Sequence, residues 1–126
     1  MPNLTVDDRT VEVPSGTRLT LAIEQAGIEI GHRCGGKARC TTCRVVFHEG
    51  EPSGLTRAEY VRLREAGLLE THRLSCQHVV THDMRLETVM TMQNQQWSDA
   101  GPALDDAVVP EAQWFDRSTL EAETTV

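Results

Sequence analysis

The chain has 126 residues, and 39% of them are hydrophobic, which is enough for one domain with a modest core. Its net charge of −7 argues against a nucleic-acid partner, because nucleic-acid-binding proteins neutralise phosphates with clustered Lys and Arg. No apolar run approaches the roughly 20 residues of a membrane span, and the N-terminus does not resemble a signal peptide, so we expect a cytoplasmic protein without a membrane span.

The first predicted element is a β-hairpin. Its apolar residues alternate with polar ones on both sides of a tight turn at residues 7–9; they are Leu4, Val6, Val11 and Val13. After the Pro-Ser-Gly sequence at 14–16, apolar residues recur at helical spacing from Leu19 to Ala26. This spacing predicts a short helix that packs across the sheet, with Thr17 as its N-cap and Gly27 as its end.

Further strands and a second helix follow along the chain. Val45 and Phe47 predict a third strand, and residues 84–89 predict a final one. Between these strands, Thr56-Arg57-Ala58-Glu59 is typical of a capping box, which predicts a second helix ending near Gly67. The mixture predicts an α+β domain, and the periodicity leaves the strand topology open.

The strongest chemical signal is the segment GHRCGGKARCTTC, residues 31–43. It places Cys34, Cys40 and Cys43 with five and two residues between them, and 32 residues separate Cys43 from Cys76. In a reducing compartment, these thiols are better candidates for metal ligation than for structural disulfides. Three ligands on one glycine-containing loop and a fourth from a distant segment suit a four-thiolate iron–sulfur cluster.

Such a cluster carries negative charge, so the loop around it needs N–H and O–H donors that point at sulfur. Gly35 and Gly36 lack Cβ atoms, so they let the backbone come close to the inorganic sulfides. We expect Thr41 and Thr42 to add hydroxyl donors.

The stretches H-R-C-G-G-K-A-R-C-T-T-C-R-V and R-L-S-C-Q resemble the cluster-binding segments of β-grasp [2Fe–2S] ferredoxins. The resemblance covers roughly residues 3–90, in the expected order of elements. The five residues between Cys34 and Cys40 are similar to the adrenodoxin and bacterial branch, whereas plant-type ferredoxins have four.

That resemblance implies a β-grasp fold with a [2Fe–2S] cluster on Cys34, Cys40, Cys43 and Cys76. It further implies that Cys34 and Cys40 hold the iron nearer the surface, and Cys43 and Cys76 the more buried one. The implied function is one-electron transport between two redox partners, a reductase and an acceptor oxidoreductase, without catalysis of its own.

The charges around the second helix and the cysteines bear on the partner. Adrenodoxin-like proteins dock basic partners on an acidic second helix, whereas the corresponding segment here carries three arginines and two glutamates: Arg57, Arg62, Arg64, Glu59 and Glu65. Five basic residues lie near the cysteines in sequence: Arg33, Lys37, Arg39, Arg44 and Arg73. They are either solvated loop charges or a basic rim for an acidic partner.

The C-terminal part of the chain differs in composition. Residues 1–92 carry 12 acidic and 11 basic side chains, whereas residues 93–126 carry 7 acidic residues and one arginine. This shift predicts a ferredoxin domain over 1–92 and an acidic extension over 93–126. The extension holds Trp97, Trp114 and Phe115, which either anchor it on the domain or bind another subunit of a larger complex; a largely disordered extension is the alternative.

Other sites and functions compete with the cluster. Structural zinc sites usually pair two C-x2-C motifs, and a Rieske centre needs two Cys-His motifs, but this chain has one C-x2-C motif, Cys40 to Cys43, and lacks the companion Cys-His motif. We expect the five histidines to be surface or hydrogen-bonding residues: His32, His48, His72, His78 and His82.

Besides a mobile carrier, two hypotheses about the function stay open: a tightly bound electron-transfer subunit of a larger redox enzyme, and a redox or iron sensor.

Overall fold

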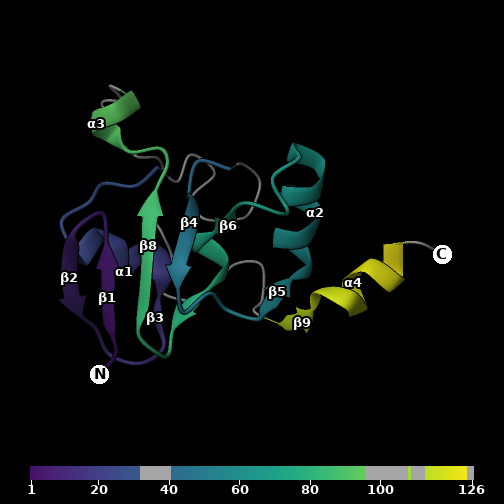
Figure 1. Ribbon diagram of the computed structural model, residues 1–126, viewed down its shortest axis with the longest axis horizontal. Coiled ribbons are helices and arrows are strands. Elements are labelled where there is room, and N and C mark those ends of the chain that lie inside the picture. The colour runs from purple at the N-terminus through teal and green to yellow at the C-terminus, as the bar shows by residue number, and fades with distance from the viewer. Residues whose placement is uncertain (32–40, 96–107, 109–112, 125–126) are drawn as a thin grey trace.

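The structure is a computed structural model that describes residues 1–31, 41–95, 108 and 113–124. Its main sheet has five strands in the order β2-β1-β8-β4-β6 (Figure 1). Strands β1 and β8 are parallel, and the other neighbours are antiparallel. The strands of this sheet are β1 (Asn3–Val6), β2 (Arg9–Glu12), β4 (Arg44–Glu49), β6 (Arg73–Leu74) and β8 (Met84–Thr88).

Two small antiparallel ladders and several helices complete the described part of the chain. One ladder pairs β3 (Thr17–Arg18) with β7 (Val79–Val80), and the other pairs β5 (Gly54–Thr56) with β9 (Trp114–Asp116). The helices are α1 (Leu19–Gln25), α2 (Arg57–Ala66), the 3₁₀ turn η1 (Ser75–Gln77), α3 (Met92–Gln95) and α4 (Arg117–Thr124). Strands and helices together confirm the predicted α+β class.

The N-terminal hairpin forms as predicted. Asp7 and Asp8 occupy its two-residue turn with φ angles of 47° and 75°, which a short polar side chain tolerates. The Asp7 carboxylate then accepts hydrogen bonds from the backbone N–H of Thr88, at 2.9 Å, and from its hydroxyl. The turn is therefore tied to the end of β8 as well as to its own strands.

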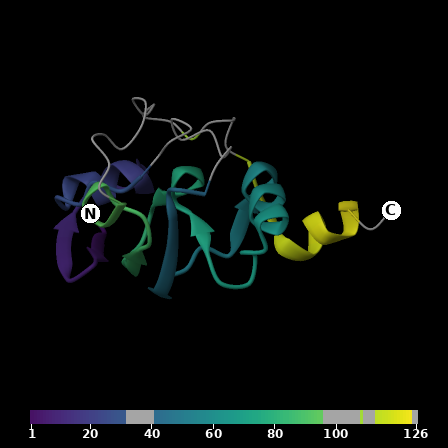
Figure 2. The same ribbon diagram turned by 90° about the horizontal axis from the view of Figure 1, so that it is seen from above.

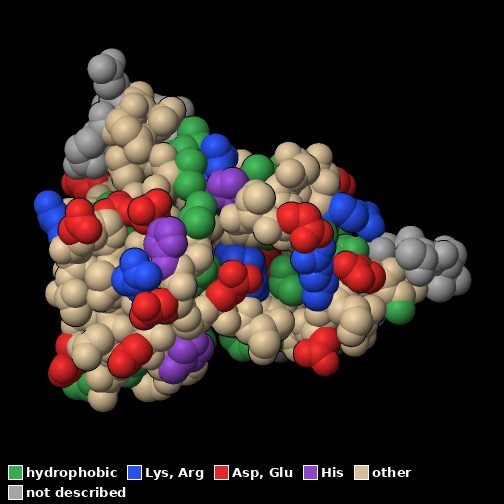
Figure 3. All heavy atoms as spheres, viewed as in Figure 1, with side chains coloured by type: hydrophobic (Ala, Val, Ile, Leu, Met, Phe, Trp, Pro, Cys, Tyr) green, Lys and Arg blue, Asp and Glu red, His purple; other side chains and the backbone are tan. Residues whose placement is uncertain are grey.

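Among the described elements, helix α1 covers one face of the five-stranded sheet, and no described helix covers the other face (Figure 2). The alternating burial of β1 and β8 follows from this arrangement, because Leu4, Val6, Met84 and Leu86 face α1. On the face that no described helix covers, acidic, basic and histidine side chains gather over the strands (Figure 3). The core between the two layers consists of residues Leu4, Val6, Val13, Leu19, Ala22, Ile23, Ile28, Ile30, Val45, Val80, Met84 and Leu86.

The prediction that Thr17 caps α1 is wrong. Thr17 is a strand residue opposite Val80, and its hydroxyl donates to the carbonyl oxygen of Pro14 at 2.6 Å. The residue at the N-cap is Arg18, whose side chain makes no capping bond. The predicted end of the helix is confirmed, because Gly27 follows it with a φ of 89°.

Helix α2 begins and ends where the sequence predicts. The side chain of Thr56 accepts a hydrogen bond from the backbone N–H of Glu59 at 3.1 Å, and Gly67 adopts the left-handed conformation after the last turn. Only half of the predicted capping box forms, because the Glu59 carboxylate turns inward to other partners. The prediction failed there because an arginine from β6 offers a stronger bond than the Thr56 backbone.

The C-terminal residues 113–124 pack on the rest of the chain. Phe115 and the buried Leu120 join a small apolar cluster with Leu55 and Tyr60, so α4 lies beside α2 (Figures 1 and 2). The prediction that Phe115 anchors the C-terminal extension on the domain is thereby confirmed. Trp97 lies outside the described residues. The division into 1–92 and 93–126 stays a prediction.

In the part of the chain that the structure describes, every helix is too short or too polar to cross a lipid bilayer.

Two glycines with the same backbone angle allow a matched test of the fold. Gly50 and Gly67 both have a φ of 73°, but a Cβ at Gly50 would clash with the carbonyl oxygen of Asp83, whereas a Cβ at Gly67 would meet nothing within 4 Å. We expect Gly67→Ala to lower the free energy of unfolding by about 1 kcal/mol, and Gly50→Ala by about 3 kcal/mol because of the added clash. Urea denaturation measures both, and equal losses would contradict the described packing of Gly50.

Candidate metal centre

Two of the four predicted ligands, Cys43 and Cys76, lie in adjoining segments. Cys43 directly precedes β4, and Cys76 lies in η1, which directly follows β6. Because β4 and β6 pair with each other, the sheet brings these two segments side by side. The backbone N–H and the hydroxyl of Ser75 both donate to the carbonyl oxygen of Cys43, at 3.2 and 2.8 Å. Cys34 and Cys40 lie outside the described residues, and their role as ligands stays a prediction.

The two thiols are shielded from water. Cys43 and Cys76 are 1% and 0% exposed, and they belong to one buried cluster with Leu63 and Leu74. Three partly buried residues pack against this cluster: Ala58, Leu68 and Leu69. An ionised thiolate is costly in such surroundings unless a metal ion and N–H donors share its charge.

The donors near the two cysteines fit an iron–sulfur cluster. The side-chain amide nitrogen of Gln77 donates to the sulfur of Cys76 at 3.6 Å. The Nε atom of Arg44, the residue after Cys43, is buried without a hydrogen-bond partner among the described residues. Donors of this kind are needed where a negatively charged group is bound.

Arg18 and Thr20, at the start of α1, hold the Cys76 turn in place. Arg18 is 1% exposed, and its Nε donates to the carbonyl oxygen of Cys76 at 3.0 Å. The hydroxyl of Thr20 lies 2.9 Å from the hydroxyl of Ser75. The sequence did not predict a role for Arg18 at this site. The one signal in the sequence is its position, because this charged residue directly precedes Leu19, the first apolar residue of the helix.

A buried polar network supports the same segment from the α2 side. Glu59 is fully buried and accepts hydrogen bonds from Arg73 Nε at 3.1 Å and from the backbone N–H of Leu74 at 2.8 Å. His78 Nε2 lies 2.7 Å from the other carboxylate oxygen of Glu59. Arg73 also donates to the carbonyl oxygens of Pro52 and Gly54. These bonds join α2, β5 and β6.

The network corrects one prediction about charge. The sequence predicts Arg73 either as a solvated loop charge or in a basic rim, but it is 6% exposed and satisfied inside the protein. Arg73 lies in β6, a strand of two residues that are both buried. So short a strand has no polar–apolar pattern from which the burial of Arg73 could be predicted. Arg44 is half-buried and donates to the carbonyl and hydroxyl oxygens of Thr41. Six further predicted residues lie outside the described ones: Arg33, Lys37, Arg39, Gly35, Gly36 and His32.

The described histidines are hydrogen-bonding residues, as predicted. His82 Nε2 lies 2.8 Å from the carbonyl oxygen of Gly50, His48 lies beside Glu87, and His72 lies beside the Thr71 hydroxyl. Burial, and then the charge of Arg44, lower the pKa of His72. Among the residues that the structure describes, no three His, Cys, Asp or Glu side chains form a group that could hold a metal ion.

The sequence matches a known family of domains. Residues 4–81 match the family described as the 2Fe-2S iron-sulfur cluster binding domain. Over 83 residues, the chain is 41% identical to one subunit of the Na(+)-translocating NADH-quinone reductase of Chlamydia pneumoniae, covering 64% of this chain and 19% of that protein. The chain thus spans about one fifth of the length of the curated relatives that it matches.

Solved structures agree with the fold. The crystal structure of the ISC-like [2Fe–2S] ferredoxin from Pseudomonas putida is similar with a TM-score of 0.60 and 30% identity, covering 71% of this chain and 93% of that one. A ferredoxin from Rhodopseudomonas palustris HaA2, 24% identical, has the same fold with a TM-score of 0.54, covering 69% of this chain and 93% of that one. The predicted β-grasp ferredoxin fold is thereby confirmed.

The buried Glu59 network predicts a dependence of stability on pH. Burial alone would raise the pKa of Glu59, but the charges and hydrogen bonds of His78 and Arg73 outweigh it and hold the pKa below the ordinary value of 4.5. A lowered pKa stabilises the fold above pH 4.5, and this contribution is lost as the pH falls through the folded-state pKa. Glu59→Gln should therefore cost about 3 kcal/mol at pH 7 and progressively less below pH 4.5.

Urea denaturation across this pH range measures the difference between the wild type and the variant. Glu65→Gln is the matched control, because Glu65 is an exposed residue of the same helix that pairs with Arg62 alone among the ion pairs described. A Glu59→Gln penalty that stayed constant down to pH 3, or that matched the Glu65→Gln penalty, would contradict a carboxylate held ionised by its neighbours.

Proposed function

The chain belongs to the 2Fe-2S iron-sulfur cluster binding domain family, so its cofactor is a [2Fe–2S] cluster, and we propose that it carries single electrons between a reductase and an acceptor oxidoreductase. In this proposal, Cys34, Cys40, Cys43 and Cys76 hold the cluster. The observation that carries it is the burial of Cys43 and Cys76 together, at the junction of two paired segments. When bound, the cluster supplies a site that gains and releases one electron at a time.

The surrounding residues suit a carrier. Leu63, Leu74 and their neighbours exclude water from the two thiols, which favours a cofactor that stays bound while its charge changes. Arg18 holds the carbonyl oxygen of Cys76, and Ser75, in the same turn, bonds to the carbonyl oxygen of Cys43, so the segments of both cysteines are fixed before any electron arrives. Little rearrangement on reduction is what rapid one-electron exchange requires.

The same residues favour electron transfer without substrate turnover. Glu59, Arg73 and His78 form the polar network beside the Cys76 turn, and all three are buried in bonds to one another or to the backbone. A general acid or base must reach a substrate proton, which these groups do not in this arrangement. We place the carrier in the cytoplasm, where thiols stay reduced.

A tightly bound subunit of a larger redox complex is the second candidate. It is favoured by the 41% identity to a protein named as a subunit of a Na(+)-translocating NADH-quinone reductase. Residues 93–126 would provide the attachment. Against this role, Phe115 and Leu120 already pack on the chain itself, which leaves less of the segment for another subunit.

The cofactor assignment predicts a visible and magnetic signature. Protein purified aerobically should be brown, contain about two irons per chain, and give a spin-half electron paramagnetic resonance signal after dithionite reduction. Cys43→Ala and Cys76→Ala should each prevent stable cluster assembly and lower the melting temperature, because the cluster links a loop to a distant segment. His72→Gln is the control and should keep the cluster, since His72 bonds to Thr71. A colourless, iron-free wild type would overturn the proposal.

Size on gel filtration separates the two candidate roles. A mobile carrier from its native source should elute near 14.0 kDa, whereas a permanent subunit should elute with its complex. A redox or iron sensor makes a third, distinct prediction, because its affinity for a partner would differ between the oxidised, reduced and cluster-free states.

A further inference from the structure

Gln77 connects the Cys76 ligand to the C-terminal segment of the chain. Its side chain is fully buried, and its amide nitrogen donates to the sulfur of Cys76 at 3.6 Å. Its amide oxygen accepts a hydrogen bond from the Thr56 hydroxyl at 2.7 Å. One side chain thus bonds to the ligand sulfur and to the N-cap of α2.

The Thr56 hydroxyl fixes which way the Gln77 amide faces. That hydroxyl oxygen already accepts a hydrogen bond from the backbone N–H of Glu59, at 3.1 Å, so its own proton is available for the Gln77 oxygen. The reverse amide orientation would leave the Thr56 proton without this acceptor and would turn an oxygen towards the negatively charged thiolate. The amide N–H therefore points at Cys76.

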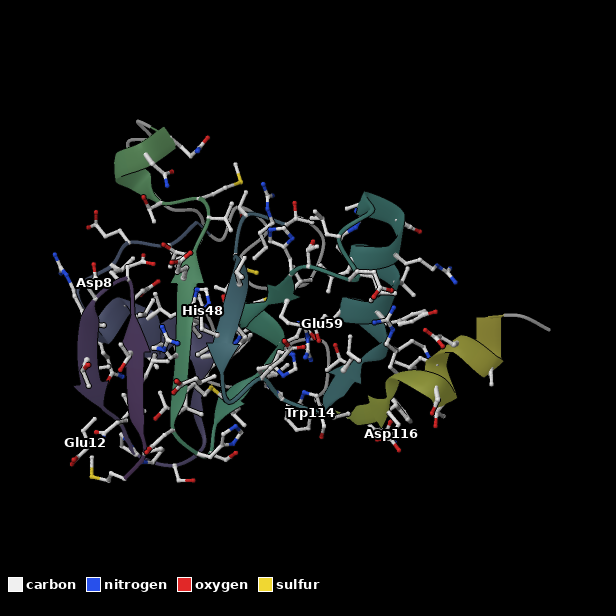
Figure 4. All side chains as sticks on the ribbon, in the orientation of Figure 1. Asp8, Glu12, His48, Glu59, Trp114 and Asp116 are labelled. Carbon is white, nitrogen blue, oxygen red and sulfur yellow. The ribbon has the colours of Figure 1, made fainter. Side chains whose placement is uncertain are left out.

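The C-terminal segment contacts this arrangement at two points. The indole N–H of Trp114 donates to the backbone carbonyl oxygen of Gln77 at 2.8 Å. In the β5–β9 ladder, Trp114 also lies directly opposite Thr56. Figure 4 shows Trp114 at the start of β9, on the side of the molecule where β5 leads into α2. The segment is held there by Phe115, whose ring lies 4.9 Å from the Arg57 guanidinium, and by Leu120.

We propose that residues 114–124 raise the reduction potential of the cluster by positioning Gln77 against the sulfur of Cys76. This inference rests on the proposed function. A hydrogen bond to a ligand sulfur stabilises negative charge, and reduction adds one more negative charge, so the bond favours the reduced state. The segment lies beyond residues 4–81, which match the family, so the positioning element is an addition to the domain.

Both contacts of the C-terminal segment help to position the side-chain amide of Gln77. Removing the indole donor leaves the Gln77 carbonyl without that bond inside a buried turn, and loosening β9 leaves Thr56 without its ladder partner. Either change lets the Gln77 side chain move away from the Cys76 sulfur. Gln77 therefore acts directly on the Cys76 sulfur, Trp114 is a positioning residue that acts through Gln77, and neither needs to contact a redox partner for this effect.

The test is a redox titration of the cluster-loaded chain of 126 residues, followed by its electron paramagnetic resonance signal. At a fixed ambient potential, Gln77→Met should lower the ratio of reduced to oxidised cluster about tenfold, which corresponds to about 59 mV for a one-electron couple. Trp114→Phe keeps the ring and removes the N–H donor, and it should lower the same ratio about two- to threefold.

Two matched controls isolate the contacts. Arg117→Gln removes the exposed ion pairs that Arg117 makes with Glu70 and Glu121. Neither pair contacts Gln77, and exposed ion pairs contribute little to docking, so this variant should leave the ratio unchanged. Thr56→Ser keeps the hydroxyl and Thr56→Ala removes it, so only the alanine variant should lower the ratio. Helix capping by Thr56 affects stability, which is read separately from the melting temperature.

Each outcome has a defined meaning. A lowered ratio in Trp114→Phe and Thr56→Ala, with unchanged controls, supports the inference even if Gln77→Met fails to bind the cluster. An unchanged or raised ratio in Trp114→Phe overturns the role of the C-terminal segment, and an unchanged ratio in Gln77→Met overturns the role of the amide. A wild type without any cluster overturns the proposed function instead, which separates the two failures.

Discussion

The rest of the structure depends on the burial of two cysteine thiols, Cys43 and Cys76, which in the proposed function bind the cluster and carry negative charge. Ionised sulfur in an apolar interior is tolerated only where metal and hydrogen-bond donors share the charge. The pairing of β4 with β6 satisfies the geometric part of this requirement, because it joins the segments of Cys43 and Cys76. Around them, Gln77 and Arg18 supply donors to the sulfur and to the backbone of Cys76.

Helix α2 does more than cover this site with Leu63. Glu59, on its inner face, binds a side chain of β6, the backbone of β6 and a histidine that follows the Cys76 turn. A buried charge of this kind is costly unless every partner is present, so the helix, the strand and the turn have one favourable relative position. The polar network thereby specifies the geometry that the apolar contacts alone would leave adjustable.

Local signals predicted the elements that form locally. The N-terminal hairpin, the caps of α2 at Thr56 and Gly67, and the cysteine spacing can all be read within a few residues. Features set by distant partners were missed. Thr17 failed as a cap because Val80, far along the chain, pairs with it, and the burial of Arg73 was missed because its partner Glu59 fits a capping box equally well. The docking of Trp114 on Gln77 likewise has no signal in either segment taken alone.

The parallel pairing of β1 with β8 has a consequence for folding kinetics. Leu4 lies opposite Met84, so a strand near the N-terminus is completed by one 80 residues later. Closing so long a loop has an entropic cost that local contacts do not compensate, which slows folding relative to the microsecond formation of a hairpin. The β1–β2 hairpin can therefore form early, but the sheet becomes continuous only after β1 has paired with β8.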